Sequence, residues 1–187
     1  MHSLTPITSL GSTEPRVDTV ADLTLSENPN VALASVAARL GQEEECRKHL
    51  IALLGSVPGP GQVQLHNPAS GFWMGPDNWM VEAPIETHED LAAQLKLQFG
   101  DTASITEQTD AWACFDLRGD GIEAVLELLC NINIRAMKMG DAQRTSIHHL
   151  GCFVTRRDPA DGLRVMGPRA SAGSLHHAIL TAMQAAL

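Results

Sequence analysis

The sequence predicts an α+β protein made of two split β-α-β halves in the ferredoxin-like style, together forming one compact domain. Three observations lead to this prediction. Strand-like apolar stretches alternate with amphipathic helical patterns, the order of these elements repeats once along the chain, and glycines recur at similar spacings in both halves. With 187 residues, of which 44% are hydrophobic, the chain can bury a substantial core.

The segment 1–30 is expected to be an irregular N-terminal arm. Pro6, Gly11, Pro15 and Pro29 interrupt every short apolar run in this segment. Terminal segments of this kind seldom form a domain of their own. We therefore expect the α+β domain to occupy residues 31–187.

The first half of the repeat, about residues 31–109, reads as strand, helix, hairpin, helix and strand. Three glutamates at the start of the first helix suit its positive end, and Gly75-Pro76-Asp77 is typical of a tight turn. Thr87 is expected to cap the second helix. The predicted elements are a strand at Val31–Ala38, a helix between Gly41 and Gly55, hairpin arms at 72–74 and 78–81, a helix after Pro84 that ends at Gly100, and a strand at 102–106.

The second half, about residues 110–187, reads as strand, helix, hairpin and helix. Apolar residues spaced i, i+3, i+4 and i+7 from Ile122 define one face of its first helix. The predicted elements are a strand at 111–117, a helix that starts at Gly119-Asp120, hairpin arms at 145–156 and 163–166 joined through 158–162, and a helix from about Ser174.

Three pairs of residues support the internal repeat. Gly41 corresponds to Gly119 and Gly71 to Gly151, and the two pairs have nearly the same separation in sequence. Pro84 corresponds to Pro168 at a slightly larger separation, and the excess falls in the longer second hairpin turn, where insertions are tolerated. The alternative is a chance similarity between two amphipathic patterns.

Charge and composition exclude several classes of protein. The net charge of −9 disfavours binding to nucleic acid or to an anionic membrane. This charge is uneven, because residues 1–134 sum to −13 and residues 135–187 to +4. No apolar run reaches the roughly 20 residues of a membrane span, and the segment 1–16 lacks the apolar core of a signal peptide. The four cysteines stand singly, so we expect a reduced, cytoplasmic protein.

A search for catalytic and metal-binding motifs finds no nucleotide-binding loop, nucleophile elbow or zinc signature. His148 and His149, on an expected strand, would point to opposite faces, and His176 and His177 would diverge on a helix. Asp120 is expected to cap a helix, Glu123 to lie in its first turn, and Asp116 to face water. We therefore expect no catalytic, cofactor-binding or metal-binding residue in this chain.

The strongest candidates for function are surface residues that another protein could cover. The segment 72–80 places two tryptophans, a phenylalanine and two methionines across one tight turn, and strand alternation sends half of them to each face. Arginine guanidinium groups in the basic last third suit the carboxylates of a partner. The alternatives are buried tryptophans and solvated arginines. The predicted partner-interface residues are Trp73, Trp79, Arg144, Arg156, Arg157, Arg164 and Arg169.

Several short segments, kept in order from about residue 30 to the end, resemble the gamma subunit of heterotetrameric sarcosine oxidase. This family is similar in turn to the first domain of the folate-binding aminomethyltransferases of glycine cleavage. The matching segments are ALASVAARLG at 32–41, the Pro-Gly loop at 58–61, Trp73 with GPDNW at 75–79, MGDAQRT at 139–145 and RASAGSL at 169–175.

The resemblance implies an aminomethyltransferase-like fold and a non-catalytic subunit in a complex with alpha, beta and delta subunits. Such a complex oxidatively demethylates sarcosine to glycine, with hydrogen peroxide and either formaldehyde or methylene-tetrahydrofolate as products. FAD, FMN, NAD, tetrahydrofolate and zinc would be held by the other subunits. Two alternatives stay open: the equivalent subunit of a related N-methyl amine dehydrogenase, for example one acting on N-methylglutamate, or a free-standing folate-binding domain.

Overall fold

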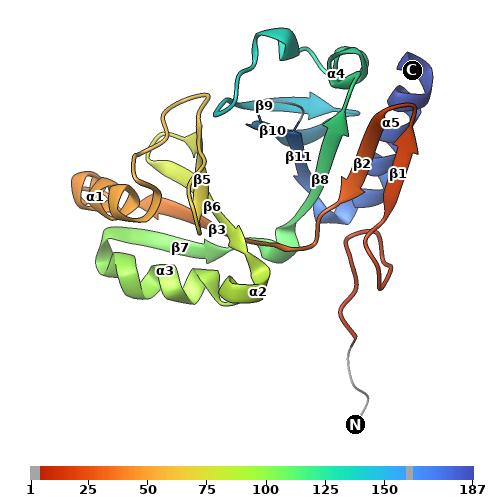
Figure 1. The fold of residues 1–187 in the computed structure, drawn as a ribbon. Helices are drawn as coiled ribbons and strands as arrows, with labels where there is room; N and C mark the ends of the chain where they lie inside the picture. The colour runs from red at the N-terminus through yellow and green to blue at the C-terminus, as the bar shows by residue number, and fades with distance from the viewer. Residues whose placement is uncertain (1–4, 159–161) are drawn as a thin grey trace. The chain divides into compact units, whose positions relative to one another are not determined.

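The computed structural model describes residues 5–158 and 162–187 and has the expected α+β architecture, with two antiparallel sheets (Figure 1). The chain divides into two compact units. Unit 1 comprises residues 1–29, 111–139 and 143–187, and unit 2 comprises residues 30–110 and 140–142.

Unit 2 contains a five-stranded sheet in the order β4-β5-β6-β3-β7. Every pair of neighbouring strands is antiparallel, and the β3–β6 register places Val36 opposite Trp79. Its elements are β3 (Val31–Ala38), α1 (Glu43–Leu54), β4 (Val63–Gln64), β5 (Ser70–Gly75), β6 (Asn78–Pro84), α2 (Ile85–His88), α3 (Leu91–Phe99) and β7 (Ala103–Glu107).

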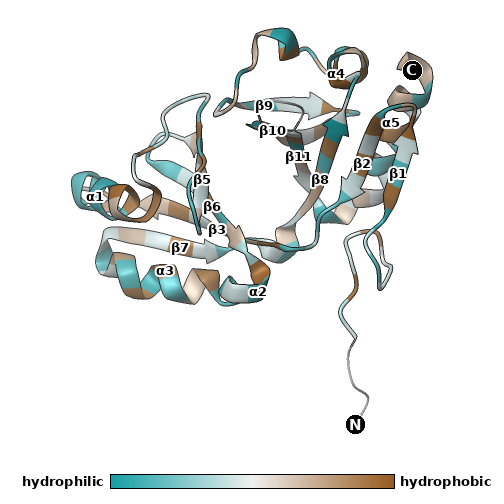
Figure 2. Ribbon diagram, in the orientation of Figure 1, coloured by the Kyte–Doolittle hydropathy of each residue, from teal (hydrophilic) through white to brown (hydrophobic). Residues whose placement is uncertain are grey.

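The core of unit 2 lies between one face of this sheet and the helices α1 and α3. The alternate residues Ala34 and Val36 of β3 point to this face, and Leu50 of α1 and Leu95 of α3 pack in the same cluster. Figure 2 shows the matching alternation of hydrophobic and hydrophilic residues along these helices. The sheet and its two helices therefore have one shared apolar interior.

Unit 1 contains a six-stranded sheet in the order β1-β2-β8-β11-β10-β9. The N-terminal strand β2 lies against β8, with Leu25 opposite Leu117, and β1 lies on the outer side of β2 (Figure 1). Its elements are β1 (Val17–Val20), β2 (Leu23–Glu27), β8 (Trp112–Gly119), α4 (Ile122–Leu129), β9 (Ala142–Ile147), β10 (Leu150–Asp158), β11 (Gly162–Pro168) and α5 (Ala172–Ala186).

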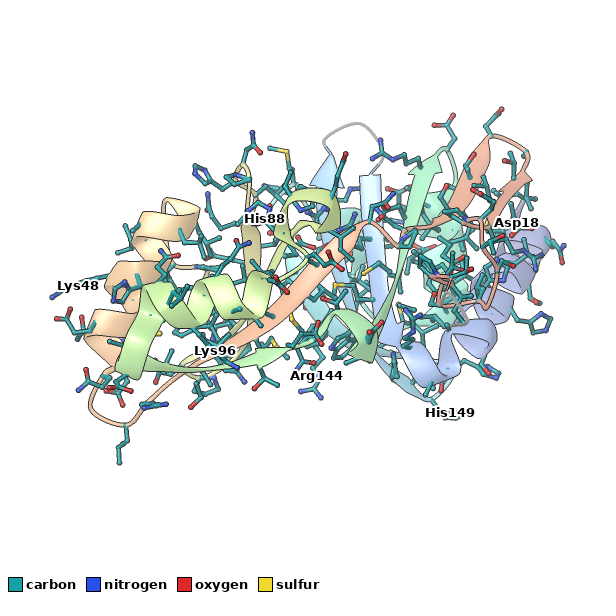
Figure 3. The ribbon with its side chains drawn as sticks, turned by 90° about the horizontal axis from the view of Figure 1, so that it is seen from below. Asp18, Lys48, His88, Lys96, Arg144 and His149 are labelled. Carbon is teal, nitrogen blue, oxygen red and sulfur yellow. The ribbon has the colours of Figure 1, made fainter. Side chains whose placement is uncertain are left out.

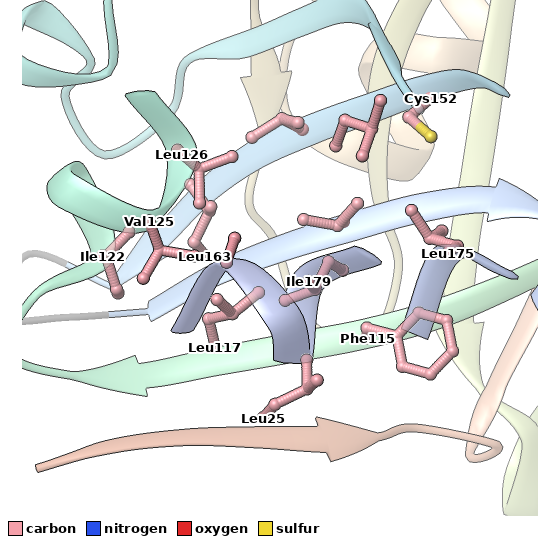
Figure 4. Close-up of a cluster of buried hydrophobic side chains, with 14 of the residues drawn as sticks. Leu25, Phe115, Leu117, Ile122, Val125, Leu126, Cys152, Leu163, Leu175 and Ile179 are labelled. Atoms are coloured by element: carbon pink, nitrogen blue, oxygen red, sulfur yellow. The ribbon is translucent and has the colours of Figure 1, made fainter. Parts of the chain in front are cut away.

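The helices α4 and α5 cover one face of the sheet of unit 1. Figure 4 shows Phe115 and Leu117 of β8 in one cluster with Val125 of α4 and Ile179 of α5. All four side chains are fully buried. Burying a side chain of this size contributes about 1.5–3 kcal/mol, so this cluster holds the helices onto the sheet.

The structure confirms the α+β class and the two split β-α-β arrangements. In each unit a strand leads into a helix, then into a hairpin and a second helix, and the two sheets share one strand order. The helical face predicted from Ile122 onward is also correct, since Ile122, Val125 and Leu126 are buried. The predicted turn at 158–162 is only partly described, because residues 159–161 lie outside the described residues.

Three details of the prediction are wrong. The segment expected to be an irregular arm contains β1 and β2, whose alternating Leu23 and Leu25 are buried in the core of unit 1. Thr87 does not cap a long helix, because α2 ends at His88 and a separate helix α3 begins at Leu91. The expected strand from 145 to 156 is two strands joined by a turn at His148-His149.

None of the helices in the described parts of the chain is both long and apolar enough to span a membrane.

Candidate functional site

The tryptophan hairpin of unit 2, formed by β5 and β6, has one buried and one accessible indole. Trp79 is only 2% exposed, packs in the core of unit 2, and its Nε1–H donates a 2.9 Å hydrogen bond to the Pro58 carbonyl oxygen. Its predicted place on a partner-facing surface is therefore wrong, because the loop at 58–61 and the sheet already enclose it. Trp73 is half-buried and packs against the same core.

The turn of this hairpin is held by charge. Arg47 of α1 forms ion pairs with Asp77 in the turn and with Glu44 of its own helix. Asp77 adopts a positive φ of 51°, a conformation that aspartate tolerates better than most residues. The turn is thus anchored to α1, and Trp73, Met74 and Pro76 keep part of their surface accessible.

Arg164 of β11 and Asp116 of β8 form a buried, two-pronged ion pair in unit 1. The guanidinium Nε and Nη2 lie 2.6 and 3.0 Å from the two carboxylate oxygens, and the side chains are 10% and 15% exposed. Asn28 donates a further 2.7 Å hydrogen bond to Asp116. The predictions that Asp116 faces water and that Arg164 lies on a partner surface are both wrong, because adjacent strands place the two side chains opposite each other.

The environment of Asp116 lowers the pKa of its carboxyl group. Burial favours the neutral acid, but the hydrogen bonds and charge of Arg164, together with Asn28 and the charge of the half-buried Arg157, outweigh that effect. The carboxylate is therefore ionised at neutral pH and paired within unit 1.

Arg156 connects the sheet of unit 1 to α4. Its Nη2 lies 3.4 Å from an oxygen of Glu123 in the first turn of α4, and the arginine side chain is 12% exposed. Glu123 thus occupies the predicted first turn, but Asp120 does not cap this helix. The N-cap is Gly121 at φ 93°, with no side-chain hydrogen bond.

The other predicted arginines are more accessible. Arg144 is exposed and lies over the ring of Phe153, 5.7 Å from its centre, while that ring packs on Trp112. Arg144 is labelled in Figure 3. Arg169 is half-buried and donates a 3.2 Å hydrogen bond to the carbonyl oxygen of Ile7. Among the predicted interface residues, Arg144 is exposed, while Trp73, Arg157 and Arg169 are half-buried.

Two carboxylate sites in unit 1 were not anticipated from the sequence. Asp18 of β1 accepts a 2.8 Å hydrogen bond from Arg16 and lies 2.8 Å from the Nε2 of the buried His176. Glu27, 4% exposed, accepts hydrogen bonds from the Ser9 hydroxyl at 2.6 Å and the Leu10 amide at 2.8 Å. The Asp18–His176 contact and the hydrogen bonds to Glu27 join residues far apart in sequence, so no local pattern could have indicated them.

The described residues do not form an arrangement suited to covalent catalysis by cysteine. Burial raises the pKa of the Cys46 and Cys152 thiols to about 11, so both stay protonated at neutral pH. Within residues 5–158 and 162–187, no group of three or more histidine, cysteine, aspartate or glutamate side chains is placed to hold a metal ion.

Each of the two antiparallel sheets is covered on one face by its own pair of helices, which defines an α+β fold. No family model matches the sequence, and no curated protein matches it at a significant level. The structure is similar to a chain of the heterotetrameric sarcosine oxidase from Corynebacterium sp. U-96, solved in complex with pyrrole 2-carboxylate. The TM-score is 0.75 at 20% identity, covering 87% of this chain and 84% of that one.

It is also similar to the glycine cleavage system aminomethyltransferase T from Bartonella henselae, with a TM-score of 0.66 at 16% identity. That match covers 86% of this chain but 46% of the aminomethyltransferase, so the present chain spans just under half of it. At these identities the comparisons establish a shared fold.

Proposed function

We propose that this chain is the gamma-type, non-catalytic subunit of a four-subunit sarcosine oxidase. The complex oxidatively demethylates sarcosine to glycine in the cytoplasm, with hydrogen peroxide and either formaldehyde or methylene-tetrahydrofolate as products. FAD, FMN, NAD, tetrahydrofolate and zinc belong to the alpha, beta and delta subunits in this proposal. The role of the present chain is to pack against a large subunit.

The proposal rests on the structural match to the sarcosine oxidase chain, which covers most of both chains. Because nearly equal shares of both chains are covered, 87% and 84%, the two chains have similar lengths as well as the same fold. A match over most of both chains supports a subunit of corresponding size. The match to less than half of an aminomethyltransferase does not carry the same weight.

Co-purification from the native organism tests the proposal. We expect a tag on this chain to capture three further subunits, among them a flavin-containing one, and the captured complex to release hydrogen peroxide when given sarcosine. Capture of a flavoprotein that oxidises N-methylglutamate but not sarcosine would keep the subunit role and change the substrate. Recovery of the chain alone, with no flavin, would refute the subunit role.

Two variants locate the partner surface. Trp73→Ala and Arg144→Ala remove the accessible indole and the exposed guanidinium, and each is expected to weaken capture of the large subunit, as loss of an anchoring residue does. Leu97→Ala, at a leucine that is 88% exposed on α3, and Arg39→Ala, at an exposed arginine of unit 2, are the matched controls. Equal capture by all four variants would place the interface elsewhere on the chain.

The second candidate is a free-standing folate-binding domain, which the likeness to the aminomethyltransferase favours. It requires that the purified chain bind tetrahydrofolate without any partner. Titration calorimetry with the isolated, folded chain decides between the two, because the subunit proposal expects no binding heat.

A further inference from the structure

The connection between β9 and β10 contains two histidines and nothing else. Strand β9 ends at Ile147 and β10 begins at Leu150, and these strands are neighbours in the sheet of unit 1. His148 and His149 both have positive φ values, 49° and 67°. A two-residue hairpin turn with both φ values positive is of type I′, which strongly favours Asn-Gly because a Cβ crowds the backbone there.

The two imidazole side chains are exposed and lie side by side. Their ring centres are 6.0 Å apart, with 50° between the ring planes. Both residues are exposed, and Figure 3 shows His149 at the periphery of the ribbon. Neither imidazole has a hydrogen-bond or ion-pair partner among the described residues. The turn thus holds two exposed residues in a strained backbone conformation, an arrangement that often marks a functional position.

Other histidines of the chain are engaged within the fold. His176 is paired with Asp18, His88 shares a 2.8 Å hydrogen bond with Thr87, and His49 packs on the ring of Phe99. The adjacent pair on α5 also differs from the turn pair, since His176 is buried and His177 is exposed. The turn therefore holds the neighbouring pair in which both imidazoles are accessible.

We propose that His148 and His149 together bind a divalent transition-metal ion of the imidazole-preferring class, such as Cu²⁺, Ni²⁺ or Zn²⁺. Imidazole nitrogens bind such ions at about 2.0–2.1 Å, so two rings on one ion have centres on the order of 5 to 6 Å apart. The observed 6.0 Å separation lies at the upper end of that range, and both side chains are exposed.

The proposed site supplies two ligands and leaves the other coordination positions to water or to a donor atom of another molecule. Bridging both turn residues, the ion also favours the left-handed backbone that they already adopt. Metal binding is therefore coupled to the stability of the β9–β10 hairpin, because an ion that binds only the folded turn stabilises it. Thermal stability therefore provides a second measure of metal binding, besides metal content.

The experiment uses the full chain, freed of metal and titrated with Cu²⁺ at pH 7.5. The test variant is the double substitution His148→Asn/His149→Gly, which removes both imidazoles and installs the residue pair that a type I′ turn prefers. The matched control, His66→Gln/His177→Gln, removes two exposed imidazoles from other places in the chain. Calorimetry gives affinity and stoichiometry, electron paramagnetic resonance counts the nitrogen ligands, and thermal unfolding gives the midpoint.

We expect the unmodified chain and the control to bind one Cu²⁺ with two nitrogen ligands and to show a higher midpoint with metal. The test variant should bind at least tenfold more weakly, show no metal-dependent shift, and have a higher midpoint than the unmodified chain without metal. If the test variant binds Cu²⁺ as the control does, or if the resonance spectrum shows a single nitrogen ligand, the proposal is wrong.

Discussion

The two units have the same strand order but obtain their outer strand from different places. In unit 2 the order β5-β6-β3-β7 uses strands that lie within one continuous segment, and β7 follows α3 directly in the chain. In unit 1 the corresponding order is β10-β11-β8-β2, and its outer strand β2 comes from the N-terminal segment. The second half of the chain therefore cannot complete its own split β-α-β arrangement.

This difference assigns a structural role to the N-terminal segment that ends at Glu27. Leu23 and Leu25 of β2 are fully buried in the core of unit 1, opposite Gly119 and Leu117 of β8. The Glu27 carboxylate, at the end of β2, accepts hydrogen bonds from residues 9, 10 and 16 and so folds the preceding segment against the unit. Unit 1 depends on residues that precede unit 2 in the chain, while the sheet of unit 2 is formed within residues 31–107.

Deleting residues 1–28 should have the largest effect. The deletion leaves β8 without a neighbour on one side and exposes core leucines, so we expect unit 1 to lose cooperative folding. Unit 2 should keep its structure. Hydrogen exchange followed by mass spectrometry measures this directly: peptides from β8, β10 and β11 lose protection, and peptides from β3 and β6 serve as the internal control. Full protection of β8 in the truncated chain would contradict the assignment.

The sequence indicates that the second half lacks a strand, but the prolines and glycine of the N-terminal segment conceal where that strand lies. The second predicted half has one strand fewer than the first, and the missing strand lies in a segment whose prolines and glycine indicate irregular structure. Those residues lie outside β1 and β2, which occupy 17–20 and 23–27. Elements within one half can be predicted from periodicity, but the pairing of β2 with β8 is a long-range contact that no local pattern specifies.

The distribution of charge along the sequence does not predict how the chain divides into units. Residues 1–134 are acidic and 135–187 basic, yet the units divide differently: unit 2 holds 4 Lys+Arg against 12 Asp+Glu, and unit 1 holds 9 against 10. The acidic N-terminal segment folds with the basic last third. Arg164, expected on a partner surface, is likewise paired with Asp116 of β8, which lies in the acidic part of the sequence but belongs to the same unit. Residue type suggests binding, but only the strand register shows that the partner lies within the chain.

Arg164→Ala should have the next largest effect, a loss of about 3–5 kcal/mol in the free energy of unfolding of unit 1, because it leaves Asp116 buried without its main partner. Arg39→Ala is the control in unit 2. Its ion pair with Asp101 is exposed, with side chains 51% and 102% accessible, and should contribute about 0–1 kcal/mol. Urea unfolding of both variants gives the two values, and equal losses would show that burial does not distinguish the pairs.

Two glycines of positive φ, one in each unit, provide a further matched pair of substitutions with an intermediate expected effect on stability. Gly119, φ 114°, ends β8, and a Cβ there would lie 1.9 Å from the backbone oxygen of Asp22. Gly41, φ 79°, follows β3, and a Cβ there would meet nothing within 4 Å. We expect Gly119→Ala to cost about 3 kcal/mol or more, since strain and a backbone clash add, and Gly41→Ala about 1–2 kcal/mol from strain alone.

The glycine pair is measured by thermal or urea unfolding. A Gly119→Ala loss no greater than that of Gly41→Ala would mean that β2 can move away from β8 at little cost. That result would also weaken the role given to the N-terminal strand.

The smallest expected effect is on the stability of unit 1 at acidic pH. Burial alone would raise the pKa of Glu27, but hydrogen bonds from Ser9 and from the backbone amides of Arg16 and Leu10 lower it below its usual range. A carboxyl group whose pKa is lowered in the folded state stabilises that state above its unfolded pKa of about 4.3, and this contribution is lost as the pH falls through the folded value. Glu27→Gln should therefore reduce stability at pH 7 and flatten its decline below pH 5.

Glu14→Gln, which removes an exposed carboxylate of the same segment, is the control for net charge. Unfolding free energies of the three proteins from pH 7 to pH 3 provide the measurement. A decline in the Glu27 variant as steep as in the unmodified chain would show that this carboxylate does not contribute to the acid sensitivity of unit 1.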